Sequence, residues 1–164
     1  MDQMPIVLSA ADVELLAALQ RDVTCSQVDL AAQAGMSRTS CWRRIREFEQ
    51  SGLLHGKVGL VNPRLAGFGL QVLLHVTMTE HTDENRESFE SHVRGLPEVT
   101  ECFSVSGDRD YLLHVVAENM DTYTEFLNSQ ILHQTSVQSA SSTFVLKRIK
   151  YTTELPLTKL VQGT

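Results

Sequence analysis

The sequence predicts an α+β protein with an N-terminal helix-turn-helix (winged-helix-like) domain followed by a ferredoxin-like βαββαβ domain. Residues 9–51 carry apolar side chains at helical spacing in three short segments. Residues 70–150 instead contain four segments with strand-like composition or alternation, separated by two helical segments. The order β-α-β-β-α-β is that of the split βαβ, or ferredoxin-like, unit.

Three helices are expected in the first domain, at about residues 9–21, 26–34 and 37–51. Serine residues stand at each expected start, and Ser9 with Asp12 forms a capping-box pattern. Gly35 ends the second helix because glycine readily adopts a positive φ, and Gly52 ends the third. Two short amphipathic helices joined at a glycine are typical of a helix-turn-helix.

The domain boundary is predicted at Asn62-Pro63-Arg64, since proline removes a backbone donor and restricts its neighbour. Domain one therefore covers residues 1–61, with residues 53–61 as a wing or connecting strand. Residues 62–69 are a hinge, and residues 70–164 form the second domain.

In the second domain the expected strands cover residues 70–78, 99–106, 111–117 and 137–150. One helix is expected to begin at Thr82 or Asp83, and another to be capped by Asp121. If both helices cover one sheet face, the other face carries mainly apolar side chains, namely Leu73, His75, Leu112, His114 and Val116. Such a face is expected to be buried against a second copy of the chain.

The charge of the chain is divided unevenly. The net charge is −6, yet Met36 to Leu60 holds five basic and two acidic residues, a net of +3. Residues 62–164 hold 8 basic and 13 acidic residues, a net of −5. A basic region on an acidic protein is expected where one face meets phosphates and the remainder stays soluble.

The basic region lies on the third helix. At about 100° per residue, Arg38, Trp42 and Arg46 point to one side, and Cys41, Ile45 and Phe48 point to the other. A basic helix of this kind fits the DNA major groove. The predicted DNA-binding residues are Ser26, Gln27, Ser37, Arg38, Thr39, Trp42, Arg43, Arg46 and Lys57.

Among these residues, Arg38 and Thr39 are expected to reach base edges, and Arg43, Arg46 and Lys57 to hold phosphates. The competing interpretation is an ordinary solvated face, against which the exposed Trp42 argues. Arg44 lies off the main basic side, so it can equally pair with a carboxylate inside the protein.

The turn Gly107-Asp108-Arg109-Asp110-Tyr111 is the densest polar cluster in the second half of the chain. Its carboxylates could accept an ammonium group or cap backbone amides, and an ordinary hairpin turn is the alternative. Arg109 adds a positive charge within this turn.

Neither catalysis nor a metal cofactor is expected. The six histidines are scattered without metal-ligand spacing, and the sequence lacks a nucleophile elbow, a P-loop and G-x-G-x-x-G. Three cysteines without paired spacing fit reduced cytoplasmic thiols. A signal peptide and a membrane-spanning segment are not expected, so the predicted location is the cytoplasm.

Five segments span nearly the whole chain in order, namely LSAADVELLAALQRD, VDLAAQAGMSRTSCWRRIREFEQSGLL, NPRLAGFG, LPEVTECFSVSGDRDYLLHVV and VLKRIKYTTELPL. Together these segments resemble the Lrp/AsnC (feast/famine) family of regulators. The resemblance implies a helix-turn-helix, a hinge and a C-terminal RAM domain. It also implies sheet-mediated dimers, commonly assembled into octamers (tetramers of dimers), with effectors such as amino acids bound between dimers.

The resemblance further implies effector-binding residues. The family's G-D-x-D-Y turn matches Gly107, Asp108, Asp110 and Tyr111, and the last strand brings Ser139 and Ser141 into consideration. Arg109, within the turn, is expected either to hold an effector carboxylate or to pair with Asp108. The family's usual Pro-Gly before the last strand is Thr135-Ser136 here. That difference is expected to alter the pocket rim.

The function expected from the sequence is a sequence-specific, DNA-binding transcription regulator. Its partners are double-stranded DNA, an amino-acid-like effector and further copies of itself. Two alternatives stay open: an architectural protein that bends or wraps DNA with little sequence choice and no effector, and a metabolite-binding assembly whose helix-turn-helix contacts proteins.

Overall fold

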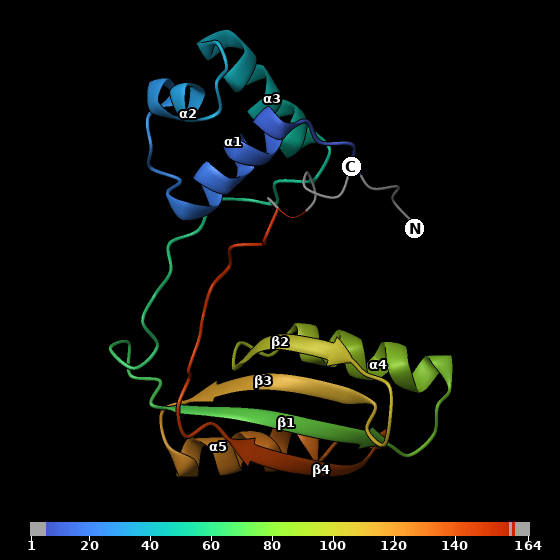
Figure 1. Cartoon of the computed structure of the whole chain (residues 1–164). Helices are drawn as coiled ribbons and strands as arrows, with labels where there is room; N and C mark the ends of the chain where they lie inside the picture. Colours follow the sequence, from blue (N-terminus) through green and yellow to red (C-terminus); the bar gives the residue numbers. More distant parts are fainter. Residues whose placement is uncertain (1–5, 158, 160–164) are drawn as a thin grey trace. The chain divides into compact units, whose positions relative to one another are not determined.

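The computed structural model describes residues 6–157 and residue 159, and it divides the chain into two compact units. One unit contains the described residues up to Gly59 together with those from Lys150 onward, and the other is Leu60–Ile149. The three N-terminal helices and the four-stranded sheet of these units are drawn in Figure 1.

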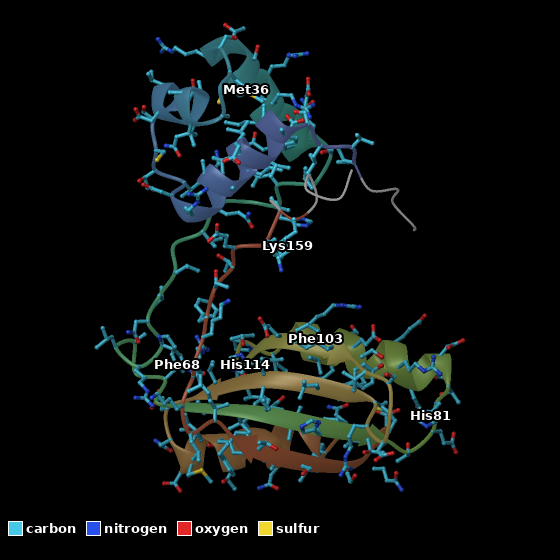
Figure 2. The ribbon with its side chains drawn as sticks, in the orientation of Figure 1. Met36, Phe68, His81, Phe103, His114 and Lys159 are labelled. Atoms are coloured by element: carbon cyan, nitrogen blue, oxygen red, sulfur yellow. The ribbon has the colours of Figure 1, made fainter. Side chains whose placement is uncertain are left out.

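The helical unit contains α1 (Ala10–Arg21), α2 (Gln27–Gln33) and α3 (Arg38–Gln50). The expected N-caps are confirmed, because Ser9, Ser26 and Ser37 each accept the backbone N–H of the residue three positions later. Gly35 has a φ of +62° and ends the α2 segment, as predicted. Met36, labelled in Figure 2, follows it in the turn to α3.

The core of this unit forms where the apolar sides of the three helices meet. Leu15 of α1, Leu30 of α2 and Phe48 of α3 are at most 3% exposed and belong to one cluster. Burial of these side chains supplies the main stabilisation, because helices this short are marginal in isolation.

The segment 53–61 corrects one prediction. The structure contains no strand there, and the side chains of Val58 and Val61 are 77% and 76% exposed. Gly56 and Gly59 interrupt the apolar run, and no described strand lies beside it to complete a ladder.

The described C-terminal residues from Lys150 onward belong to the helical unit, whereas the sequence placed residues 70–164 in the second domain. The side-chain amide of Gln20 accepts from the Leu155 N–H at 2.7 Å and donates to the Leu155 carbonyl at 3.3 Å. Glu154 lies 3.6 Å from Arg21, and Leu157 packs against the helical core. A short mixed segment carries no pattern that identifies its partner, so only tertiary contacts decide its place.

The second unit has the predicted β-α-β-β-α-β order. Its strands are β1 (Leu70–Met78), β2 (Val99–Ser104), β3 (Tyr111–Ala117) and β4 (Val137–Phe144). Its helices are α4 (Asp83–Arg94) and α5 (Met120–Phe126), the latter continued by a π-helical turn, η1 (Leu127–Ile131). The antiparallel sheet has the order β2-β3-β1-β4.

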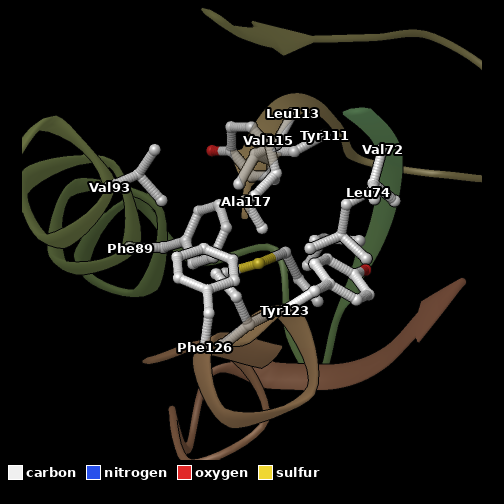
Figure 3. Packing of buried hydrophobic residues seen from close by; sticks show 13 residues of the cluster. Val72, Leu74, Phe89, Val93, Tyr111, Leu113, Val115, Ala117, Tyr123 and Phe126 are labelled. Atoms are coloured by element: carbon white, nitrogen blue, oxygen red, sulfur yellow. The ribbon is translucent and has the colours of Figure 1, made fainter. Parts of the chain in front are cut away.

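Both helices cover the same sheet face. Leu74 of β1 and Leu113 of β3 are fully buried with Phe89 of α4 and Tyr123 of α5, and the rings gather between the helices and the sheet in Figure 3. The alternating burial along β1 and β3 follows directly from the alternating sequence pattern.

Three boundaries differ from the prediction. β4 ends at Phe144, which pairs with Val72, and not near Lys150; β1 begins at Leu70, only two residues before Val72, so it is too short to pair with a strand that reaches Lys150. β2 ends at Ser104, two residues early. The cap of α5 is Asn119, whose side chain accepts two backbone N–H groups, whereas Asp121 was expected.

Among the described residues of this unit, no helix covers the opposite face of the sheet. Strand register places Leu73 opposite His114 and His75 opposite Leu112, and these side chains are only partly buried. We call this surface, made of Leu73, His75, Leu112, His114 and Val116, the open face. His114 and Phe103, which is paired with Leu112 and 51% exposed, are labelled in Figure 2.

Candidate nucleic-acid interface and effector site

Helix α3 has two distinct sides. Cys41, Ile45 and Phe48 are buried, whereas Arg38 and Arg46 are exposed and the Trp42 side chain is 46% exposed. We call the side carrying Arg38, Trp42 and Arg46 the outward face of α3. All nine residues predicted to bind DNA are exposed.

Arg44 points into the protein, which decides between the two roles left open by the sequence. Its guanidinium makes two 2.7 Å hydrogen bonds to the Asp12 carboxylate and a third to Glu47. The hydrogen bonds from Arg44 are the main reason that the pKa of Asp12 falls to about 2. Arg44 therefore holds α3 on α1 and stays out of the outward face.

The remaining cations divide into two groups. Arg43 lies 3.6 Å from Glu47, and Lys57 lies 3.4 Å from Glu49. Arg38 and Arg46 have no carboxylate within ion-pair distance among the residues that the structure describes. The guanidinium of Arg46 instead lies over the Trp42 ring, 4.7 Å from its centroid.

The two serines proposed for backbone phosphates are also helix caps. The Ser26 hydroxyl accepts the Asp29 N–H at 3.2 Å and donates to the Asp29 carboxylate. Ser37 accepts the Ser40 N–H at 3.2 Å. These hydroxyls are committed within the chain, so the N-terminal amides of α2 and α3 are the freer donors toward an anion.

In the second unit the predicted effector turn follows β2. Gly107 has a φ of +114°, a conformation that side-chain-bearing residues rarely adopt. The Asp110 carboxylate accepts the Met78 N–H at 2.8 Å and lies 3.3 Å from the ring of His81. Asp110 thus anchors the turn to the end of β1, while Asp108 is exposed.

Arg109 reaches the neighbouring strand on the open side of the sheet. Its Nη1 donates to the Thr77 hydroxyl at 3.2 Å, and Thr77 is paired in register with Ser139 of β4. Ser141 is paired with His75, one position further along the same face. The structure therefore brings Arg109 and Ser139 together through Thr77.

Tyr111 lies apart from this group, on the helix-covered side of the sheet. Its side chain is 3% exposed, and its hydroxyl donates to Glu90 of α4 at 3.1 Å. Burial, with a smaller contribution from Glu90, raises the pKa of Tyr111 to about 12. Tyr111 also lines a groove of about 470 Å³ between α4 and β2 that contains Cys102.

Sequence reasoning missed Thr77, His81 and Glu90 around the turn. His81, labelled in Figure 2, precedes α4 and reaches Asp110 across about 30 residues of chain. Cross-strand register would have identified Thr77, but register is not readable from a single sequence.

Other kinds of site were also considered. Within the described residues, no three histidine, cysteine, aspartate or glutamate side chains gather to hold a metal ion. Among the same residues, no helix has the length and apolar character needed to cross a bilayer.

Two family models match the chain. The Lrp/AsnC ligand binding domain matches residues 71–155, and a winged helix-turn-helix DNA-binding domain matches residues 8–54. The second range lies in the helical unit, and the first covers the sheet-containing unit from β1 onward together with residues 150–155, which belong to the helical unit.

Similar proteins span nearly the full length. The chain is 34% identical to the DNA-binding transcriptional activator DecR of Escherichia coli, covering 92% of this chain and 99% of that protein. It is 32% identical to the glutamate uptake regulatory protein of Zymomonas mobilis, with 89% and 88% covered.

Among solved structures, one is the complex of a transcriptional regulator from Neisseria meningitidis with L-Met. It has a TM-score of 0.88 and 34% identity, covering 94% of this chain and 99% of that one. The family models and relatives confirm the resemblance found in the sequence and the expectation that the chain is not an enzyme. This chain belongs to the Lrp/AsnC family of DNA-binding transcriptional regulators.

Proposed function

We propose that this regulator reads DNA with the outward face of α3 and changes its DNA binding when an amino acid binds at the Gly107–Tyr111 turn. The observation that carries the DNA part is the exposure of Arg38, Trp42 and Arg46, with no carboxylate paired to either arginine in the described chain. Cations that are not already neutralised gain most from phosphates and guanine edges.

The proposed division of roles follows position along α3. Arg38 and Thr39 occupy the first turn, the part of a recognition helix that reaches base edges. Arg46 lies two turns later and is assigned to phosphate. Arg43 and Lys57 are assigned weaker phosphate contacts, since each must first break its ion pair with Glu47 or Glu49.

The proposed effector is an amino acid, because the turn offers both charges that a zwitterion needs. Asp108 is exposed and accepts the ammonium group, while Arg109 exchanges its Thr77 contact for the effector carboxylate. The relative in complex with L-Met supports this class of ligand. Asp110 is assigned a structural role in holding the turn, because its carboxylate already accepts a hydrogen bond from the Met78 N–H of β1.

The open face of the sheet is proposed as the dimer interface. The partly buried side chains of Leu73, Leu112 and Val116 on the central strands are what a second copy would cover. Assembly of dimers into octamers is proposed from the family. The effector must contact groups that differ between two assemblies, since only differential affinity shifts an equilibrium.

DNA binding is tested by fluorescence anisotropy with duplexes selected by the full-length protein from a random pool. Affinity should fall steeply with salt, and Arg46→Ala should reduce the slope of log affinity against log salt by about one. Binding that extends equally over unselected DNA would favour the architectural alternative. Absent or salt-insensitive binding would remove the proposal.

The effector is tested by a thermal-shift screen against the twenty amino acids. A true effector raises the unfolding midpoint with concentration. Asp108→Ala should abolish this shift and leave DNA binding intact. Asp110→Ala serves as the contrast, because loss of its bond to Met78 should lower stability without any ligand. A normal shift in Asp108→Ala would contradict the assignment.

A further inference from the structure

Trp42 is an aromatic side chain placed where DNA-binding helices usually carry polar residues. Its side chain is 46% exposed, whereas Phe48, the other aromatic residue of α3, is 1% exposed in the core. Leaving an indole in water forgoes the stabilisation that burial would give. Such exposure on a binding face indicates a surface that is covered when the ligand is present.

The surroundings of Trp42 restrict what can cover it. Arg46 stacks over the ring at 4.7 Å from its centroid, and Arg38 lies one turn earlier on the same face. These two guanidinium groups have no carboxylate partners within the described part of the chain. The occupant must therefore offer an apolar group to the indole and negative charge beside it, which an apolar protein surface does not.

The DNA major groove offers such a combination. An indole has one hydrogen-bond donor and no acceptor, so it reads the donor and acceptor code of bases poorly. The C5-methyl of thymine is the apolar group that the major groove presents, and phosphates line both rims. A Trp–Arg stack can contact the methyl with the ring and a flanking phosphate with the guanidinium.

We infer that Trp42 is a specificity-determining residue that recognises a thymine C5-methyl and holds Arg46 in position for the adjacent phosphate. This inference rests on the proposed DNA-binding role of α3. Trp42 lies four residues after Arg38, about 6 Å along the helix. The recognised thymine is therefore expected about two base pairs from the base contacted by Arg38.

The test removes only the methyl group from DNA. Duplexes selected by the full-length protein are resynthesised with each thymine replaced in turn by deoxyuridine, and Kd is measured by fluorescence anisotropy. For the wild-type chain, one thymine per half-site should show about three- to fivefold weaker binding, the effect of losing one buried methyl contact. Other thymines should show no change at the same salt.

Variants then assign the effect to the indole. Trp42→Ala should bind more weakly and no longer distinguish thymine from deoxyuridine at that position. Its salt slope should also fall, since Arg46 loses its support. Arg43→Ala is the matched control, because this exposed cation pairs with Glu47 and should keep the full deoxyuridine effect.

The possible outcomes distinguish failure of the Trp42 role from failure of DNA binding by α3. Absence of any selected, salt-dependent duplex would contradict DNA binding by α3 itself. Selected duplexes that tolerate deoxyuridine at every position in the wild type would overturn the role of Trp42. An equal deoxyuridine effect in Trp42→Ala would overturn it as well, by assigning the methyl contact to another residue.

Discussion

At the residue scale, the Asp12–Arg44 pair shows how one cation of a basic helix is withdrawn from binding. Asp12 caps α1 through Ser9 and receives two hydrogen bonds from Arg44, so its carboxylate is 4% exposed yet fully partnered. Burying a charge without such partners would be strongly destabilising. The pair fixes α3 on α1, which sets the direction of the outward face.

Asp12→Asn tests this pair through pH. A pKa lowered from 3.8 to about 2 adds about 2 kcal/mol to the free energy of unfolding above pH 4. That contribution is lost as pH falls from 4 toward 2, so wild type and variant should differ at pH 7 and converge near pH 2. Urea unfolding followed by the fluorescence of Trp42, the single tryptophan, measures it. Glu49→Gln, which removes an exposed ion pair, should change little.

Arg38→Ala tests base reading at the start of α3. Loss of a bidentate arginine contact should relax choice at one base position and cost about 1–3 kcal/mol of discrimination there. Competition between selected duplexes and their single-base variants measures it. Unchanged discrimination between bases in Arg38→Ala would contradict base reading by Arg38 and indicate a phosphate contact instead.

At the element scale, the turn between α2 and α3 sets where the recognition helix begins. Gly35 has a φ of +62°, and a Cβ built there meets no atom within 4 Å. The requirement for glycine is therefore purely one of backbone conformation.

Gly35→Ala should lower the free energy of unfolding of the helical unit by about 1 kcal/mol, since alanine in the left-handed region is strained. Tryptophan fluorescence in urea again reports it. Gly56→Ala is the control, because Gly56 lies in the irregular segment without a positive φ, and a Cβ built there meets no atom within 4 Å. Equal losses in both variants would contradict the argument.

The C-terminal segment is the second informative element. The two hydrogen bonds between Gln20 and Leu155, together with the packing of Leu157, make it part of the helical unit. Removal of residues 150–164 should therefore destabilise that unit by about 2 kcal/mol. Gln20→Ala should reproduce only part of this loss, and an unchanged tryptophan transition in the truncated chain would contradict it.

At the scale of the whole molecule, the proposed use of the open face as the dimer interface predicts that assembly depends on pH. The Nδ1 of His114 lies 2.8 Å from the Thr100 hydroxyl, and burial lowers the pKa of His114. The charged groups near it are Glu101, paired with it on β2, and Arg148, whose charges have opposite effects on that pKa. His75 lies nearby on β1 with only Ser141 and Leu112 as its paired neighbours.

A second copy covering this face would desolvate His114 further, so protonation of His114 opposes association. Dimers should dissociate at least about tenfold more readily at pH 5.5 than at pH 7.5, as sedimentation equilibrium would show. The variant His114→Gln should lose this dependence, whereas His133→Gln, outside the open face, should keep it. A pH-independent dimer would count against the open face as the interface.

Local patterns predicted most of the fold. Serine caps and glycine stops located the three N-terminal helices, because caps act through the nearest backbone atoms. The alternation in β1 and β3 gave their bounds. Where the sequence failed, at β4 and the segment 53–61, the missing information was whether a neighbouring strand exists.

The chain by itself determined the element order, the family and the sides of α3, since periodicity and capping depend on residues close in sequence. Tertiary structure alone decided that Arg44 pairs with Asp12, that Asp110 accepts a hydrogen bond from β1 and that the C-terminal segment packs on the helical unit. Each of these contacts joins atoms more than thirty residues apart. Whether such groups meet depends on packing and register, which no local pattern encodes.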